Sequence, residues 1–389
     1  MIIKRVLALF FIWRVWLFVV AFLASHVIVV FGSSFPYSDQ VLKITNLPSW
    51  IWGFGNFDGV HYLRIAQNGY SAEYSQAFFP LYPLLVSIFA NFLPKSSTLD
   101  TTIFVDPSFF YSAFILSNLF FILALYLFFK LVRLDFDQKK AWGSVLLLLS
   151  FPTTFYFGSI YSESLFLLLS LSSLYLIRRE NFFYGGIFIL LASATRIFGL
   201  LLLPVFIIEL FLKLKSHKIK VKSEQFFKAI LGIVLAPIGI ILYMFYLNIN
   251  YQNPLYFLTA QPQFGAERTA GEIVLLPQVI FRYFKIFSTV SINSQLFFNA
   301  VLEFIFTIIP LIFLIFIFKK MRLSYFIFTL GCLILPTLTG TLSSMPRYAL
   351  MSFAILPFIT EKYQKAVVII FIILQIILLS LFIRGYWVA

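Results

Sequence analysis

Three side chains that can carry charge or transfer protons lie close together in FDGVHYLRIAQNGY (57–70), namely Asp58, His61 and Arg64. A carboxylate can act as the general base for an attacking hydroxyl, and a nearby imidazole can orient or polarise that carboxylate. If a helix follows Asp58, His61 and Arg64 lie one turn apart on the same face. We take Asp58 and His61 as candidate catalytic residues and Arg64 as a candidate substrate-binding residue. Asp58 can equally be an N-terminal helix cap without a chemical role.

The motif YSES (161–164) precedes an apolar run and contains Tyr161, Ser162 and Glu163. These three residues are candidates for binding the substrate, and the Glu163 carboxylate is suited to holding acceptor hydroxyls. Glu163 can also be structural, because the positive end of a helix dipole favours acidic residues in the first turn. Both interpretations remain open on local grounds.

Two arginines occur where apolar runs end: Arg196 in TRIFG (195–199), and Arg347, which is followed by Tyr348, in PRY (346–348). Each arginine can be an anchor at the membrane interface. Two of them on one side of a membrane would also form a phosphate clamp, because the planar guanidinium donates paired hydrogen bonds to phosphate oxygens. We take all three residues as candidates for substrate binding.

The sequence gives little support for a metal or nucleotide site. Asp135 and Asp137 form an Asp-x-Asp pair of the kind that often holds a metal in enzymes that use nucleotide sugars. The pair lies among Lys and Arg in a short loop with no room for a nucleotide-binding domain, so we interpret it as a solvated charge cluster. Glu73 and Glu163 can reach Asp58 only through the fold. We therefore predict neither a metal nor a cofactor.

The elements that position these residues are predicted to be membrane helices. The chain is 61% hydrophobic and 11% charged, and long apolar runs recur from end to end. This pattern is typical of an all-α, polytopic transmembrane helical bundle. We expect about eleven spans, at roughly 8–31, 109–129, 141–158, 163–177, 183–195, 197–212, 226–248, 295–318, 323–342, 347–360 and 366–383.

The net charge of +14 does not indicate a nucleic-acid partner, because the basic residues cluster in short loops between apolar runs. Loops rich in Lys and Arg are cytoplasmic by the positive-inside rule. Applied here, the rule places the N-terminus inside and the candidate site on the extracytoplasmic side of a multi-pass membrane protein. The single Cys332 excludes a disulfide framework. Arg14 interrupts the first apolar run, so we expect an uncleaved span in which Arg14 either reaches the interface or faces other helices.

The same rule decides how two ambiguous segments, 77–94 and 183–212, are interpreted. Residues 77–94 are apolar, but a crossing there would move every later basic loop outside, so we expect a helix in the outer interface. Residues 32–108 then form one large first external loop. Residues 183–212 form a helical hairpin that turns at TRIFG, and 248–290 form a second external loop. We treat 1–389 as a single domain.

Several motifs resemble those of a known family. FDGVHYLRIAQNGY followed by AFFPLYPLL, then SFPTTFYFGSIYSESLFLLLSLSSLYLIRRE, ASATRIFGLL and SSMPRYAL, are similar in sequence and order to motifs of the PIG-V family. That family comprises mannosyltransferases that add the second mannose of glycosylphosphatidylinositol anchors, together with prokaryotic relatives. The resemblance covers most of the chain and is densest over 50–200, and the short loops favour a prokaryotic member.

The resemblance implies a membrane glycosyltransferase of the GT-C class, with a polyprenyl-phosphate sugar as donor and inversion at the anomeric carbon. It places Asp58 at the acidic catalytic position of the class. It also favours mannose as the donor sugar, and it leaves a glycolipid, a polysaccharide or a protein as the acceptor. The lipid bilayer surrounds the protein. Two alternatives remain, a lipid or glycolipid flippase and a non-catalytic subunit. Repeated halves typical of many transporters are not visible in the sequence.

Overall fold

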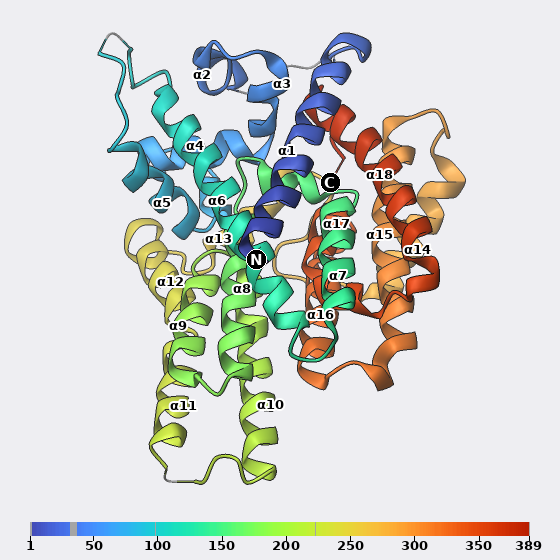
Figure 1. Ribbon diagram of the computed structural model, residues 1–389. Coiled ribbons are helices and arrows are strands. Elements are labelled where there is room, and N and C mark those ends of the chain that lie inside the picture. The colour runs from blue at the N-terminus through green and yellow to red at the C-terminus, as the bar shows by residue number, and fades with distance from the viewer. Residues whose placement is uncertain (1, 32–36, 98, 222, 389) are drawn as a thin grey trace. The chain divides into compact units, whose positions relative to one another are not determined.

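The computed structural model describes residues 2–31, 37–97, 99–221 and 223–388. Throughout these residues the regular structure is helical and no strand occurs, which confirms the all-α fold class (Figure 1). Within the described part of the chain, six helical segments are long and apolar enough to cross a membrane: Ile2–Val27, Pro107–Val132, Ile197–Lys215, Glu224–Tyr251, Gln295–Lys320 and Glu361–Ile383. The protein is therefore a multi-pass membrane protein.

The remaining expected spans coincide with shorter elements, so the described residues do not confirm the expected number of eleven. The segment 141–158 divides into a helix that ends at Ser150 and a 3-10 helix, Thr154–Gly158, because Pro152 cannot continue the α-helical hydrogen bonds. The expectation of a continuous α-helix at 347–360 is also wrong. It is mainly a buried 3-10 helix, Ala349–Phe358, which contains Pro357.

The helix at 81–90 agrees with the expectation of a non-crossing segment. It comprises Leu81–Ala90, directly after Pro80. Ten residues at 1.5 Å each give a helix of roughly 15 Å, about half the thickness of the hydrocarbon core. The hairpin at TRIFG is confirmed too, because one helix ends at Ser193 and the next begins at Leu202.

The chain divides into two compact units. Unit 1 comprises Met1–Leu168 and Thr360–Val388. Its α-helices are α1 (Ile2–Val27), α2 (Ser38–Val41), α3 (Ser49–Trp52), α4 (Asp58–Asn68), α5 (Leu81–Ala90), α6 (Pro107–Val132), α7 (Gln138–Ser150), the start of α8 (Glu163–Arg178) and α18 (Glu361–Ile383). Its 3-10 helices are η1 (Lys43–Thr45), η2 (Gly53–Gly55), η3 (Ser75–Ala77) and η4 (Thr154–Gly158).

Buried amides satisfy helix ends in unit 1. The Asn56 side chain donates to the carbonyl oxygens of Phe382 and Ile383 at the end of α18, at 2.9 and 3.3 Å. Within α18, Gln375 donates to the carbonyl oxygens of Leu149 and Phe151 at the end of α7. The last carbonyls of a helix have no partner within it, so these bonds remove a substantial cost in an apolar environment.

Arg14 of α1 faces the interior of unit 1 rather than the membrane interface. Its Nη1 donates to the carbonyl oxygen of Gly158 at 3.0 Å. Its guanidinium lies 4.4 to 4.5 Å from the ring centroids of Phe18, Phe54 and Phe114. Cation–π contacts of this kind partly offset the cost of removing the charge from water.

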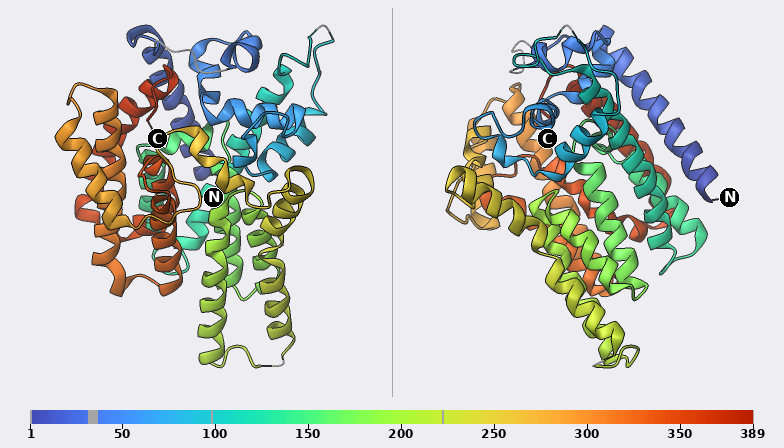
Figure 2. Two further views of the ribbon diagram at one scale, coloured as in Figure 1. Left: turned by 180° about the vertical axis from the view of Figure 1, so that it is seen from behind. Right: turned by 90° about the vertical axis from the view of Figure 1, so that its left-hand side faces the viewer.

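Unit 2 comprises the rest of α8 and the chain up to Ile359. Its α-helices are α9 (Phe182–Ser193), α10 (Leu202–Lys215), α11 (Glu224–Leu235), α12 (Ile238–Tyr251), α13 (Tyr256–Thr259), α14 (Leu276–Thr289), α15 (Gln295–Ile317), α16 (Leu323–Ile334) and α17 (Met345–Tyr348). Its 3-10 helices are η5 (Ile197–Leu201), η6 (Gln261–Phe264), η7 (Phe318–Lys320), η8 (Leu335–Thr339) and η9 (Ala349–Phe358). Helices α10 and α11 project side by side in Figures 1 and 2.

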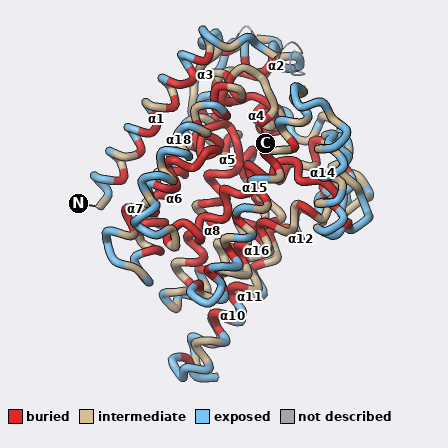
Figure 3. The backbone as a smooth tube through the Cα atoms, turned by 90° about the vertical axis from the view of Figure 1, so that its right-hand side faces the viewer, coloured by how far each residue is buried: buried red, intermediate tan, exposed pale blue. Residues whose placement is uncertain are grey.

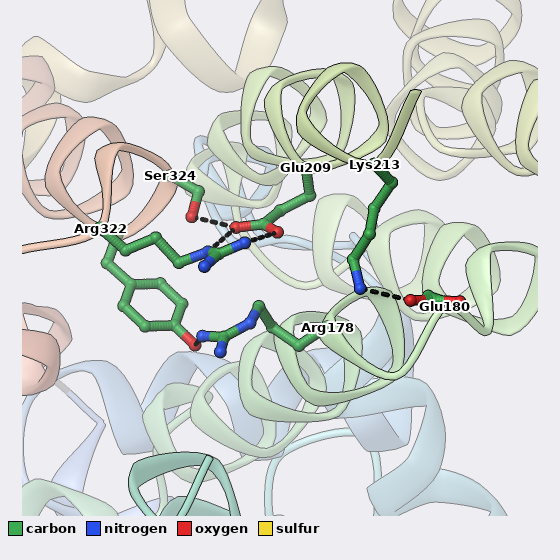
Figure 4. Close-up of polar contacts among 7 residues, drawn as sticks. Arg178, Glu180, Glu209, Lys213, Arg322 and Ser324 are labelled. Carbon is green, nitrogen blue, oxygen red and sulfur yellow. Dashed lines mark hydrogen bonds and ion pairs between the residues drawn. The ribbon is translucent and has the colours of Figure 1, made fainter. Parts of the chain in front are cut away.

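A cluster of charged residues joins three helices of unit 2 near their ends (Figure 4). Glu209 of α10 accepts two hydrogen bonds from Arg322, at 2.5 and 2.7 Å, and one from the Ser324 hydroxyl at 2.6 Å. Beside them, Arg178 donates to the Tyr325 hydroxyl at 2.6 Å, and Lys213 pairs with Glu180. A bidentate arginine–carboxylate pair satisfies most of the donors and acceptors that burial removes from water.

Burial differs between helices in the way a membrane protein requires. Helix α8 is buried along most of its length, as the red tube in Figure 3 shows. Helices α1 and α15 instead expose large apolar side chains, such as Ile12 and Phe316. An outward apolar face suits contact with lipid chains.

Candidate active site

One cluster of candidate residues lies at the start of α4 in unit 1. Helix α4 begins at Asp58, and the preceding Phe57 has φ 60° and ψ −116°. A side chain other than glycine rarely adopts this conformation, which costs about 1–3 kcal/mol and persists only where neighbours enforce it. The Phe57 ring packs against Phe382 and Trp387. Asp58 therefore occupies the first helical position after an enforced turn, and Phe57 holds the capping position.

The three predicted residues of α4 share its accessible face. Asp58, His61 and Arg64 are half-buried, whereas all of their neighbours from Gly59 to Ala66 are buried. Positions i, i+3 and i+6 of a helix lie along one side, so the structure confirms the shared face. The face presents a carboxylate, an imidazole and a guanidinium in order along the helix.

The environment of His61 favours its neutral form. Burial lowers the pKa of the His61 imidazole; the Asp58 carboxylate opposes this effect and the Arg64 guanidinium adds to it. The imidazole stacks on the Phe78 ring, with 4.8 Å between centroids. The Arg64 guanidinium lies 4.1 Å from the centroid of Tyr37. Both rings restrict the orientation of the polar groups beside Asp58.

The structure brings the YSES motif against α4. The hydroxyls of Tyr62 and Ser162 are 2.8 Å apart, and the Tyr161 hydroxyl donates to the Asn56 carbonyl oxygen at 2.8 Å. A Cβ atom on Gly59 would lie 3.2 Å from the Ile160 carbonyl oxygen, so only glycine allows this approach without a shift. Residues about one hundred positions apart in sequence thus form one polar cluster.

Glu163 is the first residue of α8 and is 1% exposed. It lies near the Tyr82 hydroxyl of α5, which bonds to Ser117 at 2.8 Å. Burial raises the pKa of Tyr82, and the charge of Glu163 adds to that effect. Tyr82 is thus a neutral hydroxyl beside the acidic group of the YSES motif.

Another cluster of candidate residues lies in unit 2, where the two predicted arginines line one small pocket. The pocket is lined by Arg196, Phe198, Cys332, Arg347, Tyr348 and Met351. The guanidinium carbons of Arg196 and Arg347 each lie 5.5 Å from the centroid of the Tyr348 ring, so they are at most about 11 Å, twice 5.5 Å, apart. Guanidinium groups suit planar anions, so the two arginines stay candidates for binding phosphate.

Comparison with known proteins identifies the family. The family model described as Mannosyltransferase (PIG-V) matches residues 1–385. The chain belongs to the PIG-V mannosyltransferase family. GPI mannosyltransferase 2 of Drosophila pseudoobscura pseudoobscura is 30% identical over 139 residues, which cover 36% of this chain and 29% of that protein. GPI mannosyltransferase 2 of Drosophila melanogaster is 30% identical over 129 residues, which cover 33% of this chain and 27% of that protein. The chain thus spans less than a third of the length of these relatives.

In this PIG-V family member, two further residues belong to the polar cluster between α4 and the YSES motif, but they do not stand out in the sequence. The Asn56 side chain donates to the end of α18, and its backbone carbonyl accepts a hydrogen bond from the Tyr161 hydroxyl. Tyr62 holds Ser162. A polar Asn directly before FDG, inside an apolar stretch, was the available signal for Asn56. Nothing in the spacing distinguishes Tyr62 from the other aromatic residues around it.

The acidic pair Asp135 and Asp137 lies away from these motifs in the sequence and is exposed, as expected. Asp137 also caps α7 by accepting from the Lys140 amide at 2.8 Å. Among the described residues, no group of three or more His, Cys, Asp or Glu side chains lies close enough to hold a metal ion. That the protein needs no metal therefore stays a prediction from the sequence.

Proposed function

We propose that this protein transfers a mannosyl residue from a polyprenyl-phosphate donor to an acceptor hydroxyl on the extracytoplasmic side of a membrane. The observation that carries the proposal is membership of a mannosyltransferase family over 1–385 in a chain whose α4 presents Asp58, His61 and Arg64 on one accessible face. A lipid-linked donor suits a reaction on the extracytoplasmic side, because nucleotide sugars are supplied in the cytoplasm and do not reach that side. The acceptor is a hydroxyl of a glycolipid, a polysaccharide or a protein.

In the proposed reaction, Asp58 is the general base. The acceptor hydroxyl gives its proton to the Asp58 carboxylate, and its oxygen forms a bond to the anomeric carbon of the donor. The bond from that carbon to the phosphate oxygen breaks, and polyprenyl phosphate leaves with the electron pair. Attack opposite the leaving group inverts the anomeric centre. Neutral His61 has an N–H that can donate to Asp58 and orient it.

Arg196 and Arg347 are proposed to bind the donor phosphate. A phosphate monoester is a tolerable leaving group, so stabilising its charge contributes more than protonating it. Both guanidinium groups lie beside the Tyr348 ring, and a planar guanidinium fork can donate to two phosphate oxygens at once. In unit 1, Arg64, Tyr161, Ser162 and Glu163 are proposed to bind sugar hydroxyls.

The test of this function is a transfer assay with the full-length chain in lipid nanodiscs. Polyprenyl-phosphate mannose, labelled in the sugar, is supplied with extracts of lipids, polysaccharides and proteins as acceptors. We expect labelled product and release of polyprenyl phosphate. Movement of a labelled lipid across vesicles, with no product from any acceptor, would instead support the flippase alternative.

A further inference from the structure

The second external segment contains an arginine that contacts the turn before Arg347. Arg268 Nη2 lies 3.3 Å from the Ser343 hydroxyl and 3.2 Å from the Ser344 hydroxyl. All of these residues belong to unit 2. Nothing in the function proposed above uses Arg268, although it is half-buried and carries a full charge.

The turn that Arg268 contacts controls the direction of Arg347. Ser344 has φ 68° and ψ 7°, the left-handed conformation that side chains other than glycine seldom adopt. The backbone amides of Arg347 and Tyr348 both donate to the Ser344 carbonyl oxygen at 3.0 Å. A change in the Ser344 backbone would therefore rotate the start of α17 and move both side chains.

The segment that carries Arg268 is also attached to η8, which precedes this turn in the chain. The Thr269 amide donates to the Thr339 carbonyl oxygen at 2.9 Å, and the Val274 amide donates to Leu338 at 3.0 Å. These bonds hold residues 269–274 along η8 and the turn that follows it. Arg268 is thus part of an attached segment and not a freely moving loop tip.

Helix α14 supports the turn from a second direction. Arg282 Nη1 donates to the Gly340 carbonyl oxygen at 2.9 Å. The Tyr283 hydroxyl donates to the buried Glu303 carboxylate and accepts from the Leu342 amide at 3.1 Å. Gly340 has φ 87°, and a Cβ atom there would lie 2.7 Å from Arg282 Nη1, so the turn requires glycine at this contact.

We propose that Arg268 is a positioning residue for donor phosphate binding: it holds the Ser343–Ser344 turn so that Arg347 and Tyr348 face the pocket they share with Arg196. This inference rests on the proposed function, because it assigns a role in binding the same donor. Since Arg268 acts through the turn, its loss should weaken donor binding more than it slows the chemical step. The predicted signature is a raised KM for the donor.

The test compares Arg268→Gln, Arg268→Lys and Lys285→Gln as full-length chains in nanodiscs. Arg268→Gln and Lys285→Gln each remove one positive charge from the second external segment, but Lys285 is exposed on α14. We expect Arg268→Gln to raise the donor KM about tenfold with less than a threefold change in kcat, and Arg268→Lys to retain part of the affinity. Lys285→Gln should match the wild type.

A double-mutant cycle tests whether the serine hydroxyls carry the effect. Ser343→Ala combined with Ser344→Ala removes both acceptors, and adding Arg268→Gln should then raise the KM no further, because residues that act through one contact are not additive. Additive effects, or a wild-type KM for Arg268→Gln, would overturn the proposal. Equal losses in kcat and thermal stability in all Arg268 variants would also overturn it, because they indicate a structural role alone.

A binding measurement separates this inference from the proposed function. Polyprenyl phosphate without sugar is titrated onto the same variants, so the result does not require turnover. Weaker binding by Arg268→Gln and unchanged binding by Lys285→Gln support the role of Arg268 even if the donor sugar or the acceptor has been assigned wrongly. Equal binding by wild type, Arg268→Gln and Lys285→Gln overturns it even if the wild type transfers mannose.

Discussion

The Tyr62 hydroxyl of α4 lies 2.8 Å from the Ser162 hydroxyl, and both side chains are buried. This bond ties the helix that carries Asp58 to the motif that carries Glu163. It gives the acidic residues of unit 1 a fixed geometry, since a site residue must be held by packing and hydrogen bonds to act reproducibly.

The first prediction concerns this bond. Tyr62→Phe should lower the free energy of unfolding by about 1 kcal/mol, the net value of a typical buried hydrogen bond. It should also reduce transfer, because Ser162 and Glu163 lose their attachment to α4. A double-mutant cycle with Ser162→Ala measures the coupling, and Tyr111→Phe, at an exposed tyrosine of α6, is the control. Additive losses in the cycle would show that the two hydroxyls are not coupled.

The second prediction concerns the phosphate-binding arginines. Arg347→Lys retains the charge but loses the planar fork, so we expect the donor KM to rise about tenfold. Arg196→Lys should act in the same direction. Initial rates over a range of donor concentrations give the KM of each variant. A donor KM equal to that of the wild type in both variants would remove these arginines from the donor site.

The third prediction is a pH dependence that arises from His61. Burial lowers the pKa of His61 in the folded state relative to the unfolded chain, so the unfolded state binds more protons as the pH falls. The stability associated with neutral His61 is present above the unfolded pKa of about 6.5 and is lost as the pH falls below it. His61→Gln should therefore reduce the loss of thermal stability between about pH 7 and pH 5. Parallel pH profiles for wild type and variant would contradict this account.

The fourth prediction concerns the charge cluster of unit 2. Glu209→Gln leaves Arg322 without its carboxylate and should destabilise the protein by roughly 3 kcal/mol, as expected when one partner of a buried pair is removed. The matched control is Glu224→Gln, which breaks the exposed pair between Glu224 and Lys228 and should have little effect on stability. Thermal inactivation of the two variants in the same membranes measures the difference. Equal effects would show that burial adds nothing to the Glu209 pair.

The sequence predicts local features well where periodicity decides them. The spacing of Asp58, His61 and Arg64 predicts a shared helical face, which the structure confirms. The break at TRIFG is predicted by the charge of the following loop, because one long helix would place that loop on the wrong side.

Other features depend on contacts between distant residues and have no local signature. The attachment of Tyr62 to Ser162, and of Arg268 to the Ser343–Ser344 turn, joins positions separated by 75 to 100 residues. Hydropathy also cannot distinguish a membrane span from an irregular segment buried in protein, since both are apolar. The α-helix expected at 347–360, which is mainly a buried 3-10 helix, is wrong for this reason.

The central claim is that Asp58 is the general base. The most direct test measures mannosyl transfer from labelled polyprenyl-phosphate mannose by wild type and Asp58→Asn at equal abundance in membranes. Asparagine nearly preserves the shape of the side chain and can still accept hydrogen bonds at a helix start, so the fold should be retained. The account predicts a loss of about 10²- to 10⁴-fold in transfer, the range typical of a lost general base. Equal transfer by the two proteins would contradict it and leave Asp58 with a structural role.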